Sequence, residues 1–154
     1  SKEEFLIYSS VDVGGLQIDG LGDGVWMNYE SDQSYVNQTA FGILQASRTR
    51  ISKTEYISCP SCGRTLFDLQ ETTAKIRKRT DHLKGIKIGI MGCIVNGPGE
   101  MADADYGYVG TGPGLISLYK GQDVVKKNIQ ASDAVDALIE LIDSNGDWVE
   151  PVND

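Results

Sequence analysis

The sequence predicts an α+β domain with a mixed β-sheet and packed helices. Strand-like and helical segments alternate in the middle of the chain, whereas three short strand-like segments further on are separated only by glycine turns. Parallel neighbouring strands need a crossover connection of about a dozen residues or more. The later strands are too close together for that, so we expect them to run antiparallel within a mixed sheet.

The first fifty residues contain four predicted elements. Residues 5–11 alternate weakly between apolar and polar and predict a strand that ends at a Gly14-Gly15 turn. A glycine loop at residues 20–24 precedes a short strand around residues 25–28. Residues 34–47 have the apolar spacing of a helix with one buried stripe. The only plausible domain boundary follows, near Arg50.

The remaining chain predicts strands at residues 51–58 and 86–91 on either side of a helix at residues 65–83, which Gly85 ends. Short strands at residues 106–109, 115–119 and 124–129 form a meander. Ser132 is positioned to cap a last helix, which Asn145-Gly146 ends. Residues 148–151 are expected to lie as a tail against the body of the domain.

Composition excludes several classes of protein. With 154 residues and 40% apolar content, the chain can bury one sizeable core, or one domain plus part of a neighbour. The net charge of −8 opposes nucleic-acid binding. We expect a soluble protein, because no apolar stretch approaches a membrane span and no signal peptide is present. An odd cysteine count, three, favours thiolate chemistry in a reducing compartment.

The cysteines form the chemical centre of the sequence. Cys59 and Cys62 make a CxxC pair after one predicted strand, and Cys93 lies 31 residues beyond Cys62 in a glycine-rich turn after the next. Loops at one edge of a sheet can converge on one ion or cluster. His82, late in a long helix, is expected at the surface. Glu100, seven residues after Cys93, is the remaining candidate for a fourth ligand.

The residues alone leave three readings of this centre open. Three thiolates and a carboxylate can hold an iron-sulfur cluster, with one iron whose ligand Glu100 a substrate oxygen could displace. The same four groups can hold structural zinc in an interaction module. Cys59 and Cys62 could also form a thioredoxin-like exchange pair.

Other polar residues have ordinary structural explanations beside functional ones. Arg64 could steer an anion or brace its loop, and the basic run at residues 75–79 could meet an acidic electron carrier or be a solvated helix face. Asp103 and Asp105 fit a turn entering a strand better than a metal site. The glycines between residues 107 and 114 do not open a helix, which argues against dinucleotide binding.

Two segments resemble the 4-hydroxy-3-methylbut-2-enyl diphosphate synthase family. They are SCPSCGR at residues 58–64, followed by Phe67-Asp68, and MGCIVNGPGE at residues 91–100. The resemblance continues through residues 20–24 and Trp148-Val149, so it covers nearly the whole chain. The residues of these motifs are most similar to the plant, chlamydial and Bacteroidetes-like form of the family.

The resemblance implies a [4Fe-4S] cluster on Cys59, Cys62, Cys93 and Glu100, in a domain at residues 51–154 similar to those of sulfite and nitrite reductases. Residues 1–50 would end a preceding, inserted barrel-like domain. The implied reaction is reductive ring opening of 2-C-methyl-D-erythritol 2,4-cyclodiphosphate in non-mevalonate isoprenoid (terpenoid) biosynthesis. Ferredoxin or flavodoxin would supply two electrons singly. Asn96 would lie near the substrate or, equally, brace its loop.

The family also has an N-terminal TIM barrel that grips the diphosphate and that this sequence lacks. We therefore expect a cluster-binding fragment that is inactive by itself. The resemblance further implies a homodimer for the full-length enzyme, located in the cytoplasm of a bacterium or in the plastid stroma of a plant.

Overall fold

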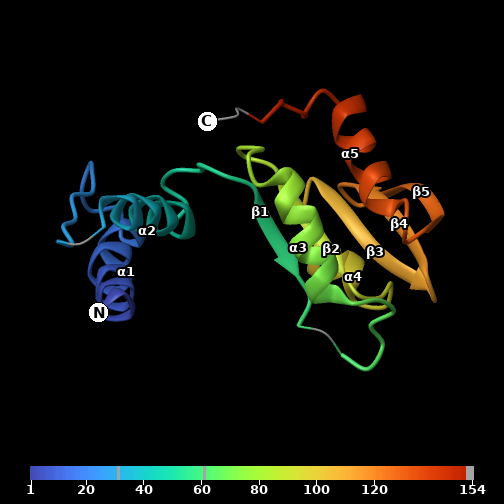
Figure 1. Cartoon of the computed structure of the whole chain (residues 1–154), viewed down its shortest axis with the longest axis horizontal. Coiled ribbons are helices and arrows are strands. Elements are labelled where there is room, and N and C mark those ends of the chain that lie inside the picture. Colours follow the sequence, from blue (N-terminus) through green and yellow to red (C-terminus); the bar gives the residue numbers. More distant parts are fainter. Residues whose placement is uncertain (31, 61, 152–154) are drawn as a thin grey trace. The chain divides into compact units, whose positions relative to one another are not determined.

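The computed structural model describes residues 1–30, 32–60 and 62–151, and the chain divides into two compact units, Ser1–Ser52 and Lys53–Asp154 (Figure 1). The first unit is a pair of helices, α1 (Lys2–Ile18) and α2 (Gln33–Ala46). That this unit ends a preceding barrel-like domain stays a prediction. None of the helices in the described part of the chain has the length and apolar content that a membrane span requires.

The strand predicted at residues 5–11 is wrong, because this segment lies within helix α1. The overlooked signal is a capping box, in which Ser1 Oγ accepts a hydrogen bond from the Glu4 N–H and the Glu4 carboxylate bonds back to the N-terminus. Gly14 is a buried helical residue rather than a turn, and a Cβ built there would lie 3.6 Å from Ile43 Cγ2 of α2. The helix pair therefore packs closely at this glycine.

The rest of the first unit confirms one expectation and corrects another. The helix predicted at residues 34–47 is α2, whose N-terminus is capped by the Asp32 carboxylate accepting from the Tyr35 N–H at 3.0 Å. The strand predicted around residues 25–28 is absent from the described structure, where that segment is irregular. The described residues of the first unit include no other strand that could pair with it, and an unpaired strand is not stable.

The second unit contains a five-stranded sheet and three helices (Figure 1). In chain order the elements are β1 (Glu55–Ser58), α3 (Leu69–Thr80), β2 (Lys87–Met91), α4 (Gly97–Glu100), β3 (Tyr106–Gly112), β4 (Leu115–Lys120), β5 (Asp123–Gln130) and α5 (Ala134–Ser144). The strands lie in the order β1-β2-β3-β4-β5. The pairs β1–β2 and β2–β3 are parallel, and the pairs β3–β4 and β4–β5 are antiparallel. The predicted α+β class with a mixed sheet is confirmed.

The two faces of the sheet are covered differently. On one face, α3 and α5 pack against β2, β3 and β4 around fully buried residues such as Ile76 and Leu138. On the other face the cover is the segment that contains α4. Met101 lies there over Gly89 and Gly107, which are register partners on β2 and β3. The absence of side chains at this glycine pair lets the α4 segment approach the sheet.

Helix boundaries in the second unit differ from the predicted ones. Helix α3 begins at Leu69 instead of residue 65, because Asp68 caps it by accepting from the Glu71 N–H at 2.8 Å. Helix α5 begins after Asp133, so Ser132 is not its cap. The predicted end of α5 at Asn145-Gly146 is confirmed, with Gly146 at a φ of 78°.

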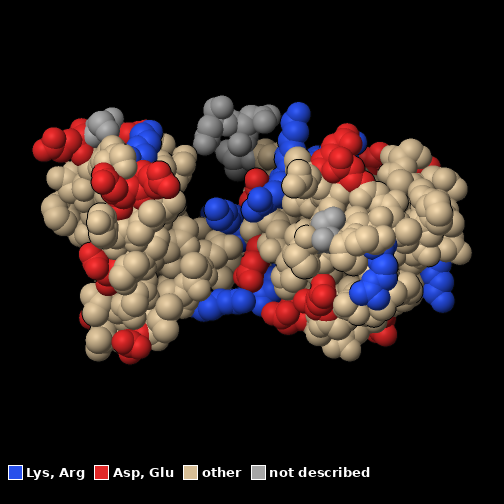
Figure 2. All heavy atoms as spheres, turned by 90° about the horizontal axis from the view of Figure 1, so that it is seen from below, with Lys and Arg blue, Asp and Glu red and all other residues tan. Residues whose placement is uncertain are grey.

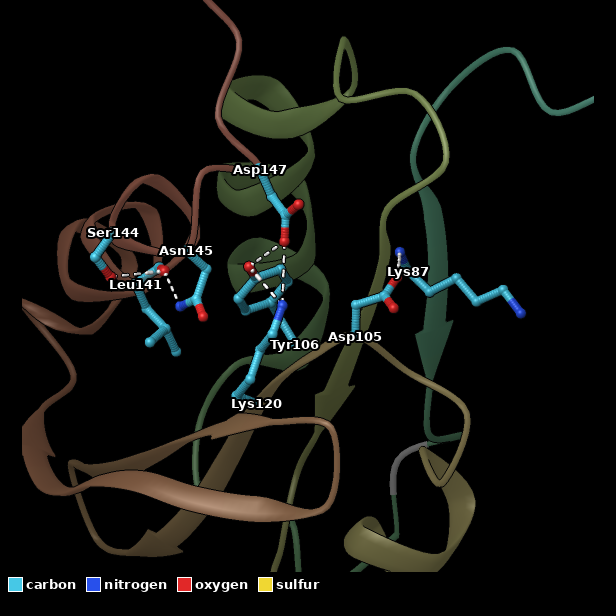
Figure 3. Close-up of polar contacts among 8 residues, drawn as sticks. All are labelled: Lys87, Asp105, Tyr106, Lys120, Leu141, Ser144, Asn145 and Asp147. Carbon is cyan, nitrogen blue, oxygen red and sulfur yellow. Dashed lines mark hydrogen bonds and ion pairs between the residues drawn. The ribbon is translucent and has the colours of Figure 1, made fainter.

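The chain after α5 lies against the second unit, as predicted. The Trp148 ring packs edge-on against His82 with centroids 5.1 Å apart, and the His82 ring bonds to the Val149 carbonyl. Figure 3 shows a second tie, in which Asp147 accepts from the Tyr106 hydroxyl at 2.6 Å and from Lys120 Nζ at 3.1 Å. The His82 ring, which was expected at the surface, is half-buried against the tail.

Candidate functional site

The cysteine-bearing loops leave neighbouring parallel strands at the same edge of the sheet. Ser58 at the end of β1 is in register with Ile90 of β2. The Cys59 N–H donates to the Ile90 carbonyl at 3.3 Å, which extends the pairing by one residue. Cys93 follows two residues after the end of β2. Because the carboxyl ends of parallel strands meet at one edge, the two loops converge there.

Gly92 ties the two loops together. Its N–H donates to Cys59 Sγ at 3.3 Å, and its carbonyl accepts from the Leu66 N–H at 3.1 Å. The backbone of one cysteine loop therefore bonds both to a sulfur and to the backbone of the other. A Cβ at Gly92 would come within 2.8 Å of Thr65 side-chain atoms, so this approach requires glycine.

The turn that carries Cys62 is closed from both sides by Thr65. The Thr65 N–H donates to the Cys62 carbonyl at 3.0 Å, and Thr65 Oγ1 accepts from the Cys62 N–H at 3.2 Å. Beyond it, the Phe67 ring packs edge-on against Tyr108 with centroids 5.5 Å apart. The residues that follow the CxxC pair thus anchor its loop to the sheet.

Glu100 is positioned by a single helical turn, where the sequence suggested a tight loop. Its N–H donates to the Asn96 carbonyl at 3.0 Å. Gly97 at the start of α4 lies against Met91, to whose Cβ an added methyl would come within 2.8 Å. Met101, immediately after Glu100, is buried on the sheet. Glu100 itself is exposed at the end of this turn, so its carboxylate can change orientation.

All four proposed ligands line one pocket of about 100 Å³, which we call the cysteine pocket. Its lining consists of Cys59, Pro60, Cys62, Arg64, Thr65, Met91, Cys93, Asn96, Gly97 and Glu100. Within residues 1–30, 32–60 and 62–151, no three His, Cys, Asp or Glu side chains gather closely enough to bind one metal ion. The four candidate ligands therefore line a common cavity.

The thiols differ in exposure and in electrostatic environment. All three are free; Cys59 and Cys93 are half-buried, and Cys62 is exposed. Hydrogen bonds from the Arg64 backbone N–H and guanidinium, together with its charge, lower the pKa of the Cys62 thiol, and the Cys93 side chain adds a smaller effect in the same direction. Arg64 therefore stabilises a thiolate, which is the form that binds metals.

Of the other polar candidates, Asp103 and Asp105 lie outside this pocket. Asp105 accepts a hydrogen bond from the Lys87 N–H at 2.8 Å (Figure 3). Asp103 Oδ2 lies 3.4 Å from Lys87 Nζ. The two carboxylates hold the start of β2, which supports the structural explanation of this acidic pair. Asn96 lines the pocket but makes no side-chain cap bond to α4.

Several residues that shape the site were not singled out from the sequence. Gly92, Thr65 and Met101 each determine how a ligand-bearing segment is seated. Gly110 belongs with them, because a Cβ there would lie 2.5 Å from the Gly92 carbonyl oxygen. The glycines of residues 107–114 were considered only as a nucleotide loop, and their spacing on a strand was the available signal.

Comparison with known proteins gives a family and several relatives. Residues 55–144, from the start of β1 to the end of α5, match the family model described as "GcpE protein C-terminal domain". The chain is 66% identical over 142 residues to 4-hydroxy-3-methylbut-2-en-1-yl diphosphate synthase (flavodoxin) of Parabacteroides distasonis, an alignment covering 92% of the chain and 23% of the relative.

A similar match extends to other groups of organisms. The synthase (flavodoxin) of Protochlamydia amoebophila is 56% identical over 150 residues, covering 97% of the chain and 23% of the relative. The synthase (ferredoxin), chloroplastic, of Arabidopsis thaliana is 57% identical over 151 residues, covering 97% of the chain and 20% of the relative. The chain thus spans less than a quarter of the length of these relatives.

Proposed function

The chain belongs to the GcpE family, through the C-terminal domain of that family, and from this we propose that its second unit binds a [4Fe-4S] cluster on Cys59, Cys62, Cys93 and Glu100. The observation that carries the proposal is the cysteine pocket. Three thiols and one carboxylate, delivered by two loops at one sheet edge, surround a single space.

The chemistry of these residues fits the group. Thiolates are the usual ligands of iron-sulfur clusters, and hydrogen bonds to the sulfurs tune the cluster potential. The Gly92 N–H makes such a bond to Cys59 Sγ. Three thiols and a carboxylate that line one pocket suit a group of several atoms.

A bound cluster would supply single electrons and one iron atom with an exchangeable carboxylate ligand. The residues of the chain would do the rest. Glu100, at the exposed end of a one-turn helix, would supply that carboxylate. Asn96 lies one turn earlier and also lines the pocket, where its amide would donate a hydrogen bond to a substrate oxygen.

For the whole enzyme we propose the reaction that the family resemblance implies, whose product is the diphosphate named for the relatives. Reductive opening of 2-C-methyl-D-erythritol 2,4-cyclodiphosphate consumes two electrons and two protons and yields 4-hydroxy-3-methylbut-2-enyl diphosphate and water, a step of non-mevalonate isoprenoid biosynthesis. The names of the relatives support flavodoxin or ferredoxin as the electron donor. A homodimer, in a bacterial cytoplasm or in a plastid stroma as for the chloroplastic relative, belongs to the same proposal.

Binding of the diphosphate we assign to the part of the relatives that lies outside the match. Among the described residues that line the cysteine pocket, Arg64 is the only cation. A cyclic diphosphate requires several Lys or Arg donors. The chain alone, with reduced carrier and the cyclodiphosphate, is therefore expected to form no product, and product formation would contradict this assignment.

The cluster is tested by anaerobic reconstitution with iron and sulfide, followed by visible absorption and by quantification of iron, sulfide and zinc. We expect a brown protein with about four irons, and a Cys93→Ser variant that no longer retains them. A colourless protein that keeps one tightly bound zinc would instead establish the interaction-module alternative. Unchanged properties in Cys93→Ser would favour an exchange pair at Cys59 and Cys62.

Glu100 needs a separate test, because three thiolates alone can hold a cluster. In the reconstituted Glu100→Gln variant we expect a cluster that loses iron faster in the presence of a chelator and has an altered electron paramagnetic resonance spectrum after reduction. The matched control is Glu3→Gln, the same change at an exposed carboxylate of the first unit. Identical behaviour of the two variants would remove Glu100 from the ligand set.

A further inference from the structure

A second depression borders the cysteine pocket. It has a volume of about 380 Å³ and is lined by the end of β1, by Cys59 and Pro60, and by one face of α3. The α3 residues on this face are Gln70, Thr73, Ala74 and Arg77, which have the spacing of neighbouring positions on a helix. We call this depression the α3 groove. Cys59 and Pro60 line both the groove and the pocket.

Cys59, which lines both depressions, connects the groove with the proposed cluster. Cys59 is half-buried, and its sulfur is held by the Gly92 N–H on the pocket side. A molecule seated in the groove would therefore contact a proposed cluster ligand directly. It would not enter the cysteine pocket, where Glu100 and Asn96 leave room for a substrate.

Helix α3 also carries unneutralised positive charge at this groove. Of its four basic side chains, Lys75 pairs with Glu71 at 2.7 Å and Arg79 pairs with Asp136. Within the described residues, Arg77 and Lys78 have no carboxylate at ion-pair distance. The Arg77 guanidinium instead lies over the Tyr56 ring, 4.8 Å from its centroid, which fixes the charge beside the groove.

The two cations lie on a chain that is acidic as a whole. Its net charge is −8, and on the face shown in Figure 2 acidic and basic side chains are interspersed over the second unit. An acidic protein would be repelled by the chain as a whole and attracted locally at Arg77 and Lys78. Such a pattern orients an encounter, because charges guide partners over about one Debye length, roughly 8–10 Å.

We propose that the α3 groove, with Arg77 in its lining and Lys78 next to Arg77 in α3, is the docking surface for an acidic one-electron carrier protein. The proposal rests on the proposed function, since it assumes a cluster on Cys59. In each encounter the reduced carrier loses one electron and the oxidised cluster gains it, by way of the Cys59 sulfur. One charged surface would serve carriers of both kinds that the names of the relatives print, flavodoxin and ferredoxin.

The test uses the reconstituted chain and photoreduced flavodoxin in a stopped-flow instrument, with cluster bleaching as the readout. At low ionic strength we expect Arg77→Glu and Lys78→Glu each to lower the second-order rate constant about five- to tenfold, and salt to remove the difference. Ala74→Trp, which fills the groove without changing charge, is expected to lower the rate as well.

The matched control is Lys127→Glu, the same change of charge on exposed β5, at the opposite edge of the sheet from β1. Its rate should stay within about twofold of the wild type. Reduction by dithionite, which needs no docking surface, should be equally fast in all variants and shows that their clusters are intact.

The outcomes separate the two proposals. A chain that takes up no iron and sulfide overturns the proposed function before any carrier is added. Normal clusters, reduced by flavodoxin equally fast in Arg77→Glu and in Lys127→Glu, overturn the docking surface and leave the cluster assignment standing. A slow Ala74→Trp together with unaffected Arg77→Glu and Lys78→Glu would also overturn the charge-based docking.

Discussion

Gly110 on β3 offers the sharpest test of how the two cysteine loops are joined. A Cβ at this position would lie 2.5 Å from the Gly92 carbonyl oxygen and 3.2 Å from Phe67 Cε1. The first of these atoms belongs to the backbone and cannot turn aside as a flexible side chain would. Gly110→Ala must therefore displace Gly92, whose N–H and carbonyl bond to Cys59 Sγ and to the Leu66 N–H.

The cost follows from these contacts. Overpacking by one methyl group destabilises a protein by about 1–3 kcal/mol, and loss of the Gly92–Leu66 hydrogen bond adds about 1 kcal/mol. We expect the free energy of unfolding of the second unit to fall by about 2–4 kcal/mol, which lowers the urea midpoint by roughly 1–3 M. Cluster retention should fall too, because the displaced Gly92 precedes Cys93.

The assay follows Trp148 fluorescence during urea unfolding in a Trp26→Phe background, so that the signal reports on the second unit only. Trp26 is 87% exposed, and its replacement should be neutral. The control is Gly112→Ala on the same strand, where the added methyl would meet only side-chain atoms of Leu115, at ordinary distances of 3.5 and 3.8 Å. Equal stability of Gly110→Ala and Gly112→Ala would refute the argument that close approach of Gly110 to Gly92 fixes the loops.

Three further predictions concern the support of the site and of the tail. Met101→Ala should lower the free energy of unfolding by about 2–5 kcal/mol and loosen α4, whereas Met101→Leu should lower it by less than about 1.5 kcal/mol. Urea unfolding measures the stability of each variant, and the rate of iron loss to a chelator measures the effect on α4. Asp68→Ala should cost about 1 kcal/mol by removing the α3 cap, whereas Asp68→Asn keeps it, and similar losses in both variants would contradict a capping role. The pKa of Asp147 is lowered by hydrogen bonds from the Tyr106 hydroxyl and Lys120, so its stabilising effect is present above the unfolded pKa of about 4 and is lost as the pH falls through the folded pKa. Because Asp147 is 37% exposed, Asp147→Asn should cost only about 0.5–1 kcal/mol at neutral pH. The difference from wild type should disappear in acid, and a difference that persists there would contradict this role of the carboxylate.

The sequence predicted the second unit well because its strands are bounded by strong signals. Glycine turns separate β3, β4 and β5, and the apolar run before Gly92 is too short for a helix. The positions of Cys59 and Cys93 after two strands were enough to predict that their loops converge. The ligand set itself came from the resemblance to a family and from the one remaining carboxylate, Glu100, and it stays a proposal.

The failures occurred where local and tertiary signals disagree. In α1 the neighbouring apolar residues Leu6, Ile7 and Tyr8 imitate a strand, and they remain exposed on the helix, so no buried stripe reveals the period of the helix. The Ser1–Glu4 capping box was the better evidence. The start of α3 was misplaced because residues 65–68 carry helix-compatible spacing but bond instead to the cysteine loops, as Leu66 does to Gly92.

The glycines of the second unit are best understood as contact surfaces for the site. Gly89 and Gly107 lie side by side in the sheet and receive Met101, which seats the turn that carries Glu100. On the same strand as Gly107, Gly110 lies against the carbonyl of Gly92. The N–H of Gly92 donates to the sulfur of Cys59. The turn that carries Glu100 and the backbone at Gly92 therefore both pack against β3, a strand that contributes none of the proposed ligands. A substitution on β3 is thus expected to disturb the cysteine pocket as strongly as a substitution in the loops that line it.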